Sequence, residues 1–133
     1  MKIAVILGTR PEIIKLSPII KQLNKKSTSV IFTGQHYDHN MSMNFIDQLS
    51  LDKPNYSMKI PKTNPELQIS EIIKKLSKIF AAEKPDNVVI QGDTNTVLAA
   101  GIASLKCNIS ISHIESGLRS NDWRMPEEHN RII

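Results

Sequence analysis

Short continuous apolar runs alternate along the chain with segments in which apolar residues recur every three or four positions. The short runs predict strands at residues 2–7, 29–33, 87–91 and 109–113, and we expect a shorter one near 56–58. The spaced segments predict amphipathic helices at residues 11–24, 41–49, 64–84 and 95–105. Strands that are apolar throughout and alternate with helices are typical of a parallel sheet covered on both faces. The pattern therefore predicts an α/β fold.

Prolines mark three of the expected helix starts. Pro11 is placed at a first helical position, and Asn64-Pro65-Glu66 combines a cap, a proline and an acid. Residues 126–133 open in the same way and stop as an apolar stripe begins. We therefore expect the 133 residues to be one N-terminal domain, residues 1–133, cut from a longer protein.

Composition narrows the function classes. Hydrophobic residues make up 40% and charged residues 23%, as in ordinary globular domains, while aromatics at 5% are too few for a stacking surface that binds single-stranded nucleic acid. Apolar stretches are too short to span a bilayer, and a strand that begins at Met1 leaves no room for a signal peptide. We expect no nucleic-acid partner and no membrane partner.

The charge and the single cysteine add little chemistry. The net charge is +4, but the lysines are scattered, as on solvated helix faces, so any preference for an anionic ligand is weak. Cys107 is alone, which excludes an internal disulfide and favours a reducing, cytoplasmic setting. We expect its thiol to be inert and half-buried.

Three strands end in compact polar clusters. The clusters are 8–12 (Gly-Thr-Arg-Pro-Glu), 91–95 (Gln-Gly-Asp-Thr-Asn) and 113–117 (His-Ile-Glu-Ser-Gly). In an open parallel sheet, ligands bind beyond the carboxyl ends of the strands. We therefore predict that the three clusters form one site that contains a guanidinium, several carboxylates and an imidazole.

The first cluster is typical of an anion site. Gly8 permits a sharp turn, and the following helix start offers N–H groups and a positive dipole end. Arg10 adds bidentate geometry for phosphate, and Lys15 lies one turn further along the helix. The alternative is a structural turn with an exposed arginine, and spacing alone does not choose between the two.

Carboxylates dominate the other clusters. Asp93 is a candidate acid or base, although either Asp93 or Thr94 is equally suited to cap the next helix. Glu115 follows a strand that we expect to be buried, so it needs either a function or a partner, for which Arg119 is the candidate.

Two further features have ordinary explanations. Glu127 and the glutamate after it are suited to complement a helix dipole. Two histidines, His36 and His39, together with Asp93, His113 and Glu115, are a conceivable metal set. No compact metal-binding spacing is present, however, and we expect no metal.

Taken in order, these clusters resemble the non-hydrolysing UDP-N-acetylglucosamine 2-epimerases. The resemblance rests on 8–12, on Gly34-Gln35-His36, on 92–94 with Thr96, on 113–119 and on 126–131, and it covers nearly the whole chain. It implies the first Rossmann-like domain of a two-domain enzyme of the GT-B type, in which the full-length protein is a dimer. The isolated 133 residues are then expected to be inactive.

The resemblance also implies a reaction and its residues. UDP leaves C1, a carboxylate removes the C2 proton to give 2-acetamidoglucal, and return of a proton and of UDP yields the C2 epimer, with no cofactor. Asp93, Glu115 and Glu127 match the catalytic acids of the family. Arg10 and Lys15 match its phosphate-side cations, and the further substrate contacts are Gln35, His113 and Arg119.

This sequence departs from the family pattern at two positions. Ser116 replaces a usual alanine, a small-for-small change, and Asp38 replaces a glutamine in a region where some members bind an activating substrate molecule. Three other functions stay open: a related sugar-nucleotide epimerase or hydrolysing relative, a non-catalytic nucleotide-binding module, and a metal hydrolase.

Overall fold

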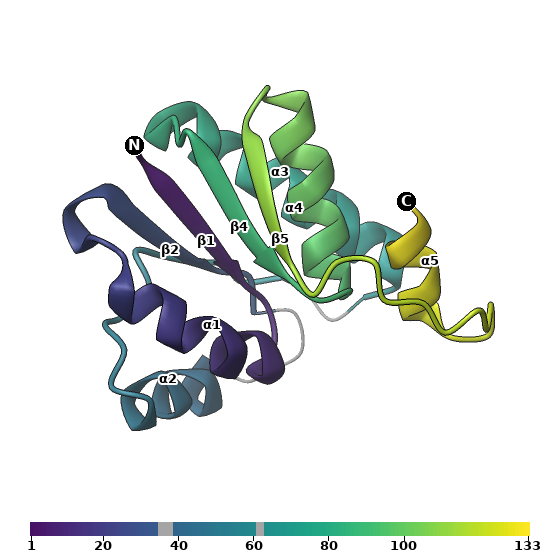
Figure 1. The fold of residues 1–133 in the computed structure, drawn as a ribbon, viewed down its shortest axis with the longest axis horizontal. Helices are drawn as coiled ribbons and strands as arrows, with labels where there is room; N and C mark the ends of the chain where they lie inside the picture. Colours follow the sequence, from purple (N-terminus) through teal and green to yellow (C-terminus); the bar gives the residue numbers. More distant parts are fainter. Residues whose placement is uncertain (35–38, 61–62) are drawn as a thin grey trace.

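The computed structural model describes residues 1–34, 39–60 and 63–133 and contains one parallel sheet (Figure 1). The strand order is β3-β2-β1-β4-β5, and every pairing between neighbours is parallel. The strands are β1 (Ile3–Leu7), β2 (Thr28–Phe32), β3 (Tyr56–Ser57), β4 (Asn87–Gln91) and β5 (Ser110–Ile114). This order matches the first five positions of the Rossmann order 3-2-1-4-5-6, and it confirms the predicted α/β class.

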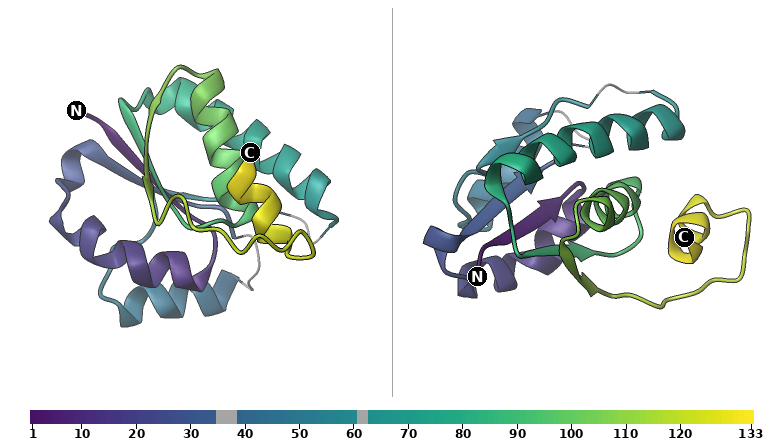
Figure 2. Two further views of the ribbon diagram at one scale, coloured as in Figure 1. Left: turned by 45° about the vertical axis from the view of Figure 1, so that its right-hand side comes forward. Right: turned by 90° about the horizontal axis from the view of Figure 1, so that it is seen from above.

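Helices cover both faces of this sheet (Figures 1 and 2). One face carries α1 and α2, and the other carries α3 and α4. Beyond the sheet, α5 packs against α4. The helices are α1 (Arg10–Gln22), the short 3-10 turn η1 (Lys25–Ser27), α2 (His39–Gln48), α3 (Pro65–Glu83), α4 (Asn95–Lys106) and α5 (Pro126–Ile132).

Alternation along the strands divides the core into two layers. Ala4 and Ile6 of β1 pack with the α3 and α4 side, while Val5 and Leu7 pack with the α1 and α2 side. Successive strand residues point to opposite faces, so an entirely apolar strand supplies both layers at once. The continuous apolar runs in the sequence have this physical origin.

The strand expected at 109–113 is not buried. β5 runs over Ser110–Ile114 and is largely exposed, because it pairs with β4 on one side only and lies at the edge of the sheet. Cys107, just before it, is also exposed, so the prediction of a half-buried thiol was wrong. Edge position, which local sequence does not reveal, accounts for the exposure of β5, whereas Cys107 caps the carboxyl end of α4.

Helix α1 carries much of the predicted chemistry. It begins at Arg10, so Pro11 is the second helical residue, one later than predicted. Pro18 lies inside the helix and has no N–H to donate, and the Ser17 hydroxyl donates to the carbonyl of Ile14 instead, at 2.9 Å. The helix therefore continues past its proline to Gln22.

The remaining boundaries agree with the sequence to within a few residues. α3 ends at Glu83, with Lys84 in the left-handed region, and α5 begins at Pro126. Among the described residues, no helix combines the length and the apolar character that a bilayer crossing requires.

Candidate active site

Three turns leave the sheet at its carboxyl edge, after β1, β4 and β5, and they contain the three polar clusters (Figure 1). Figure 2 shows the long loop that runs outward from β5 and returns to α5, which lies beside α4. Four segments that are distant in the sequence therefore contribute to one edge: the start of α1, the turn from β4 into α4, the end of β5, and α5.

Hydrogen bonds join the three clusters. Thr94 Oγ1 donates to Glu12 Oε1 at 2.5 Å, which links the turn after β4 to the start of α1. Lys15 Nζ lies 2.7 Å from Glu115 Oε2, which links α1 to the turn after β5. Gln91, the last residue of β4, donates to the same Glu115 oxygen. The clusters form one connected network.

Glu115 is held as an anion at this edge. Its bond to the Lys15 ammonium, with a smaller contribution from Gln91, lowers the pKa of the carboxyl. The side chain is 38% exposed and the backbone φ is +60°, a left-handed conformation that is uncommon for glutamate. An exposed, ionised carboxylate on a constrained turn is suited to accept a proton. Its partner is Lys15 and not Arg119, as the sequence had suggested.

Asp93 faces α5. Both Nε and Nη2 of Arg131 donate to Asp93 Oδ2, at 2.8 and 2.7 Å. The Asn130 side chain donates to the Asp93 backbone carbonyl at 2.8 Å. Thr94, not Asp93, caps α4, accepting the Val97 N–H at 3.4 Å. The Asp93 carboxylate is therefore not a helix cap but the partner of Arg131 in α5.

Glu128 is a second centre of the network. Its side chain is fully buried and accepts bonds from Arg119 (2.6 Å), Arg131 (3.1 Å), both the backbone and the hydroxyl of Ser120 (3.0 Å each) and the Asn121 backbone (3.2 Å). Led by the Ser120 backbone bond, these donors lower the pKa of Glu128 to about 2. This residue fixes the loop before α5, which is more than the helix-dipole role expected from the sequence.

Two N–H groups of the turn before α1 already have a partner within the chain. The backbone N–H groups of Gly8 and Thr9 donate to the carboxylate of Glu12 within the same turn, the latter at 2.7 Å. Gly8 is required by close packing, because a Cβ there would meet Thr96 Oγ1 at 2.3 Å. Its φ is not positive.

Two other predicted residues lie at the same edge. His113 Nε2 lies 2.7 Å from the carbonyl of Gly92, an acceptor, so this nitrogen carries the hydrogen. Glu127 is half-buried in the first turn of α5.

The remaining predicted residues are placed less closely. The exposed guanidinium of Arg10 lies over the ring of Phe45 in α2, 5.2 Å from its centroid. Gln35, His36 and Asp38 lie outside the described residues. The side chain of His39 is likewise outside the described part, and among the side chains that the structure does describe no three metal-binding groups lie close enough together to hold an ion.

Comparisons with known proteins identify the family of this chain. The sequence profile of the UDP-N-acetylglucosamine 2-epimerases matches residues 20–133. The UDP-N-acetylglucosamine 2-epimerase of Methanococcus maripaludis is 49% identical over 99% of this chain. The chain belongs to the UDP-N-acetylglucosamine 2-epimerase family.

The relatives extend beyond this chain, which spans about 36% of the M. maripaludis protein. A crystal structure of the Methanocaldococcus jannaschii UDP-GlcNAc 2-epimerase in complex with UDP-GlcNAc and UDP matches with a TM-score of 0.93 and 47% identity, over 99% of this chain and 37% of that one. The UDP-2,3-diacetamido-2,3-dideoxy-D-glucuronate 2-epimerase of Pseudomonas aeruginosa is 40% identical over the whole of this chain and 38% of its own length.

Sequence reasoning assigned no role in this epimerase-family site to Glu12, Gln91, Glu128 or Arg131. Each of them carried a local signal. Thr9-Arg10-Pro11-Glu12 has the spacing of a capping box, which the structure contains, and Glu128 and Arg131 are three apart on one helix face. Gln91 ends an otherwise apolar strand, a position that points a polar group at the sheet edge.

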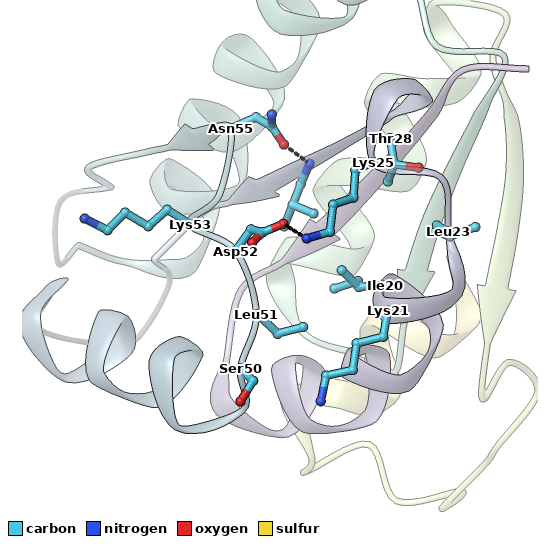
Figure 3. A pocket seen from close by; sticks show the side chains of 11 residues that line it. Ile20, Lys21, Leu23, Lys25, Thr28, Ser50, Leu51, Asp52, Lys53 and Asn55 are labelled. Carbon is cyan, nitrogen blue, oxygen red and sulfur yellow. Dashed lines mark hydrogen bonds and ion pairs between the residues drawn. The ribbon is translucent and has the colours of Figure 1, made fainter.

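A hollow of about 430 Å³ lies elsewhere, at the amino ends of the strands (Figure 3). It is bounded by the end of α1, the start of β2 and the loop 50–55, and the exposed pair Lys25–Asp52 crosses its mouth at 2.5 Å. None of the predicted site residues lines this hollow. It is therefore separate from the candidate active site.

Proposed function

We propose that this chain supplies one side of the active site of a UDP-N-acetylglucosamine 2-epimerase, which interconverts UDP-N-acetylglucosamine and UDP-N-acetylmannosamine. The observation that carries the proposal is the contact between Lys15 and Glu115, a cation and an ionised carboxylate 2.7 Å apart at the sheet edge of an epimerase-family chain. The relative that binds UDP-GlcNAc and UDP, with a TM-score of 0.93, supports the substrate.

The adjacency of these two groups suits the chemistry. The C1–O bond breaks as UDP leaves with the electron pair, and positive charge on the ring makes the hydrogen on neighbouring C2 acidic. A base then takes that proton and the C2–H electrons form the C1–C2 double bond of 2-acetamidoglucal. Because the two events involve neighbouring carbons, a cation that holds the diphosphate and a carboxylate that takes the proton must lie side by side.

Roles follow for the predicted residues. Lys15 and Arg10 hold the diphosphate, and Glu115 takes the C2 proton. Asp93 and Glu127 face the sugar and return a proton to the other face before UDP adds back. His113, Gln35 and Arg119 are substrate contacts. The proposed reaction returns every electron and proton, so it needs no redox cofactor.

The test is deuterium incorporation by the protein at its full natural length. Incubated with UDP-N-acetylglucosamine in deuterium oxide, it should give both epimers with deuterium at C2, read by NMR. Epimer formation without label at C2 would reject the elimination route. Turnover lost with a chelator and restored by a metal ion would favour a metal hydrolase.

A second candidate is a related enzyme that acts on a modified UDP-sugar, which the 40% identical P. aeruginosa relative favours. Supplying each UDP-sugar separately distinguishes the two substrates. Release of free N-acetylmannosamine in place of UDP-N-acetylmannosamine would identify a hydrolysing enzyme.

We also propose that the protein at its full natural length is a cytoplasmic homodimer. Family membership and the solitary Cys107 support this assignment. Light scattering measures the mass of the assembly, and fractionation of cells measures the compartment.

A further inference from the structure

Glu12 is a buried carboxylate that the proposed reaction does not use. Its side chain is 2% exposed, and it accepts hydrogen bonds from three donors: the backbone N–H groups of Gly8 and Thr9 and the hydroxyl of Thr94. Buried carboxylates are costly unless they are fully hydrogen-bonded, and this one has a donor for each oxygen. Burial raises the pKa of Glu12, while the three donors act in the opposite direction.

The three donors belong to two different turns. Gly8 and Thr9 form the turn after β1, which leads directly to Arg10. Thr94 belongs to the turn after β4, and it follows Asp93. Glu12 and Thr94 are 82 residues apart in the sequence, so the hydrogen bond between their side chains is a tertiary link between the two turns.

The donor and the acceptor of each hydrogen bond in this link are fixed by the other bonds that these groups form. Backbone N–H groups can only donate, so Glu12 Oε2 must accept. Thr94 Oγ1 accepts the Val97 N–H as the cap of α4, which directs the hydroxyl hydrogen toward Glu12 Oε1. A carboxylate fits this set of donors, and an amide has only one oxygen for them.

The two turns also pack closely. The Gly8 Cα lies so near Thr96 that no Cβ fits between them, and Thr96 Oγ1 lies 2.8 Å from Thr33 Oγ1. Close packing prevents the turns from moving past one another, and the carboxylate sets their register.

We propose that Glu12 is a positioning residue that sets Arg10 relative to Asp93 by bonding the two turns that carry them. This inference rests on the proposed function, in which Arg10 holds the diphosphate and Asp93 faces the sugar. A displacement of about 1 Å of a catalytic group can cost on the order of a hundredfold in rate.

The experiment uses the protein at its full natural length and four single variants. Glu12→Gln and Thr94→Val alter the link, and Thr94→Ser keeps the hydroxyl. The matched control is Glu83→Gln, because Glu83 also accepts hydroxyl bonds, from Tyr56 and Ser29, but lies by the amino ends of the strands. Steady-state kinetics of epimerisation, inhibition by UDP and the melting temperature are measured for each.

We expect Glu12→Gln and Thr94→Val to lower kcat/KM by about tenfold or more and to weaken UDP inhibition in parallel. Thr94→Ser should have wild-type kinetics. Glu83→Gln should also have wild-type kinetics, even where its melting temperature falls as much as that of Glu12→Gln or Thr94→Val. The double variant Glu12→Gln/Thr94→Val should be no slower than the worse single variant, because both act through one contact.

Three results would overturn the inference. They are wild-type kinetics in Thr94→Val, equal kinetic loss in Glu83→Gln at an equal loss of stability, and independent, multiplying losses in the double variant. If Glu12→Gln does not fold, Thr94→Val decides, and because this variant also removes the cap of α4, its kinetics are compared with those of Glu83→Gln at a matched loss of melting temperature. An inactive wild-type protein rejects the proposed function, whereas an active one with unaffected link variants rejects only the role of Glu12.

Discussion

Lys15 and Glu115 are 100 residues apart in the sequence, and their side chains lie 2.7 Å apart at the carboxyl edge of the sheet. The pair joins a helix that follows the first strand to a turn that follows the last. Because Lys15 lowers the pKa of Glu115, the carboxyl stays ionised in mildly acidic solution. The proposed base is therefore kept in its proton-accepting form.

Removing the lysine should move the pH dependence of the reaction. In Lys15→Gln, the pKa of Glu115 returns toward its ordinary value, so the acid limb of the kcat/KM profile should shift to higher pH. Lys15→Arg should keep the limb where it is in the wild type. The free energy of unfolding of Lys15→Gln should differ from that of the wild type by at most about 1 kcal/mol, because the Lys15–Glu115 pair is exposed. A pH–rate series from pH 4 to 9, roughly the range in which a carboxyl and its neighbours titrate, provides the measurement.

The matched control for that substitution is Lys25→Gln. Lys25 forms an exposed pair with Asp52 at the opposite end of the sheet, so its removal should leave the profile unchanged. A profile that does not move in Lys15→Gln would show that Glu115 is not the base.

The carboxylates should be separable from nucleotide binding. Asp93→Asn and Glu115→Gln keep the shape of each side chain but remove its charge, so each should reduce kcat by about a hundredfold or more while UDP still binds. Calorimetric titration with UDP and turnover assays on the same samples check this. Normal turnover in both variants, with UDP bound, would favour a non-catalytic nucleotide-binding module.

Glu128 should make the protein sensitive to acid. Its pKa is about 2 in the folded state against an ordinary value of 4.5, so the native state prefers the ionised form. The resulting stability is present above pH 4.5 and is lost as the pH falls from 4.5 toward 2. Glu128→Gln should therefore unfold at lower urea than the wild type at neutral pH, and this difference should narrow at about pH 3.

A partly exposed glutamate, Glu71, provides the comparison for Glu128. Glu71 forms only long contacts with Lys74 and Lys75 along α3, at 3.8 and 3.6 Å. Glu71→Gln should unfold at nearly the same urea concentration as the wild type at both pH values. A Glu128→Gln protein that is as stable as wild type at pH 7 would contradict the assigned role.

Gly8 should tolerate no side chain. Gly8→Ala places a Cβ 2.3 Å from Thr96 Oγ1, so the turn must shift, with an overpacking cost of about 1–3 kcal/mol. Gly101→Ala is the control, because a Cβ there meets nothing within 4 Å, and in the interior of a helix it should stabilise by about 0.5–1 kcal/mol. Chemical denaturation of both variants measures the difference, and equal stabilities would refute the close approach.

Much of this arrangement could be predicted from local patterns. The apolar runs placed β1 and β4 to within a residue, and the proline and cap signals placed the starts of α3 and α5. The position of the polar clusters at one edge followed from a general property of parallel sheets. The exposure of the edge strand β5 could not be predicted in this way, and β5 was wrongly expected to be buried. The local sequence of a strand does not tell whether a second neighbour pairs with it.

Pairing between the clusters was less predictable. Arg119 was the natural candidate for Glu115 because it is close in sequence, yet it binds Glu128, and Lys15 binds Glu115. Of the two glutamates at the start of α5, the buried one is Glu128, which a helix-dipole argument could not distinguish from its neighbour.

The sequence by itself determined which segments form strands and helices and which polar residues leave the sheet at its carboxyl edge, because periodicity and cap signals act over a few neighbouring residues. Only the tertiary structure decided which carboxylate meets which cation and which carboxylates are enclosed. Those outcomes depend on strand order, helix crossing and loop path, which bring together residues such as Glu12 and Thr94 that are 82 positions apart in the sequence.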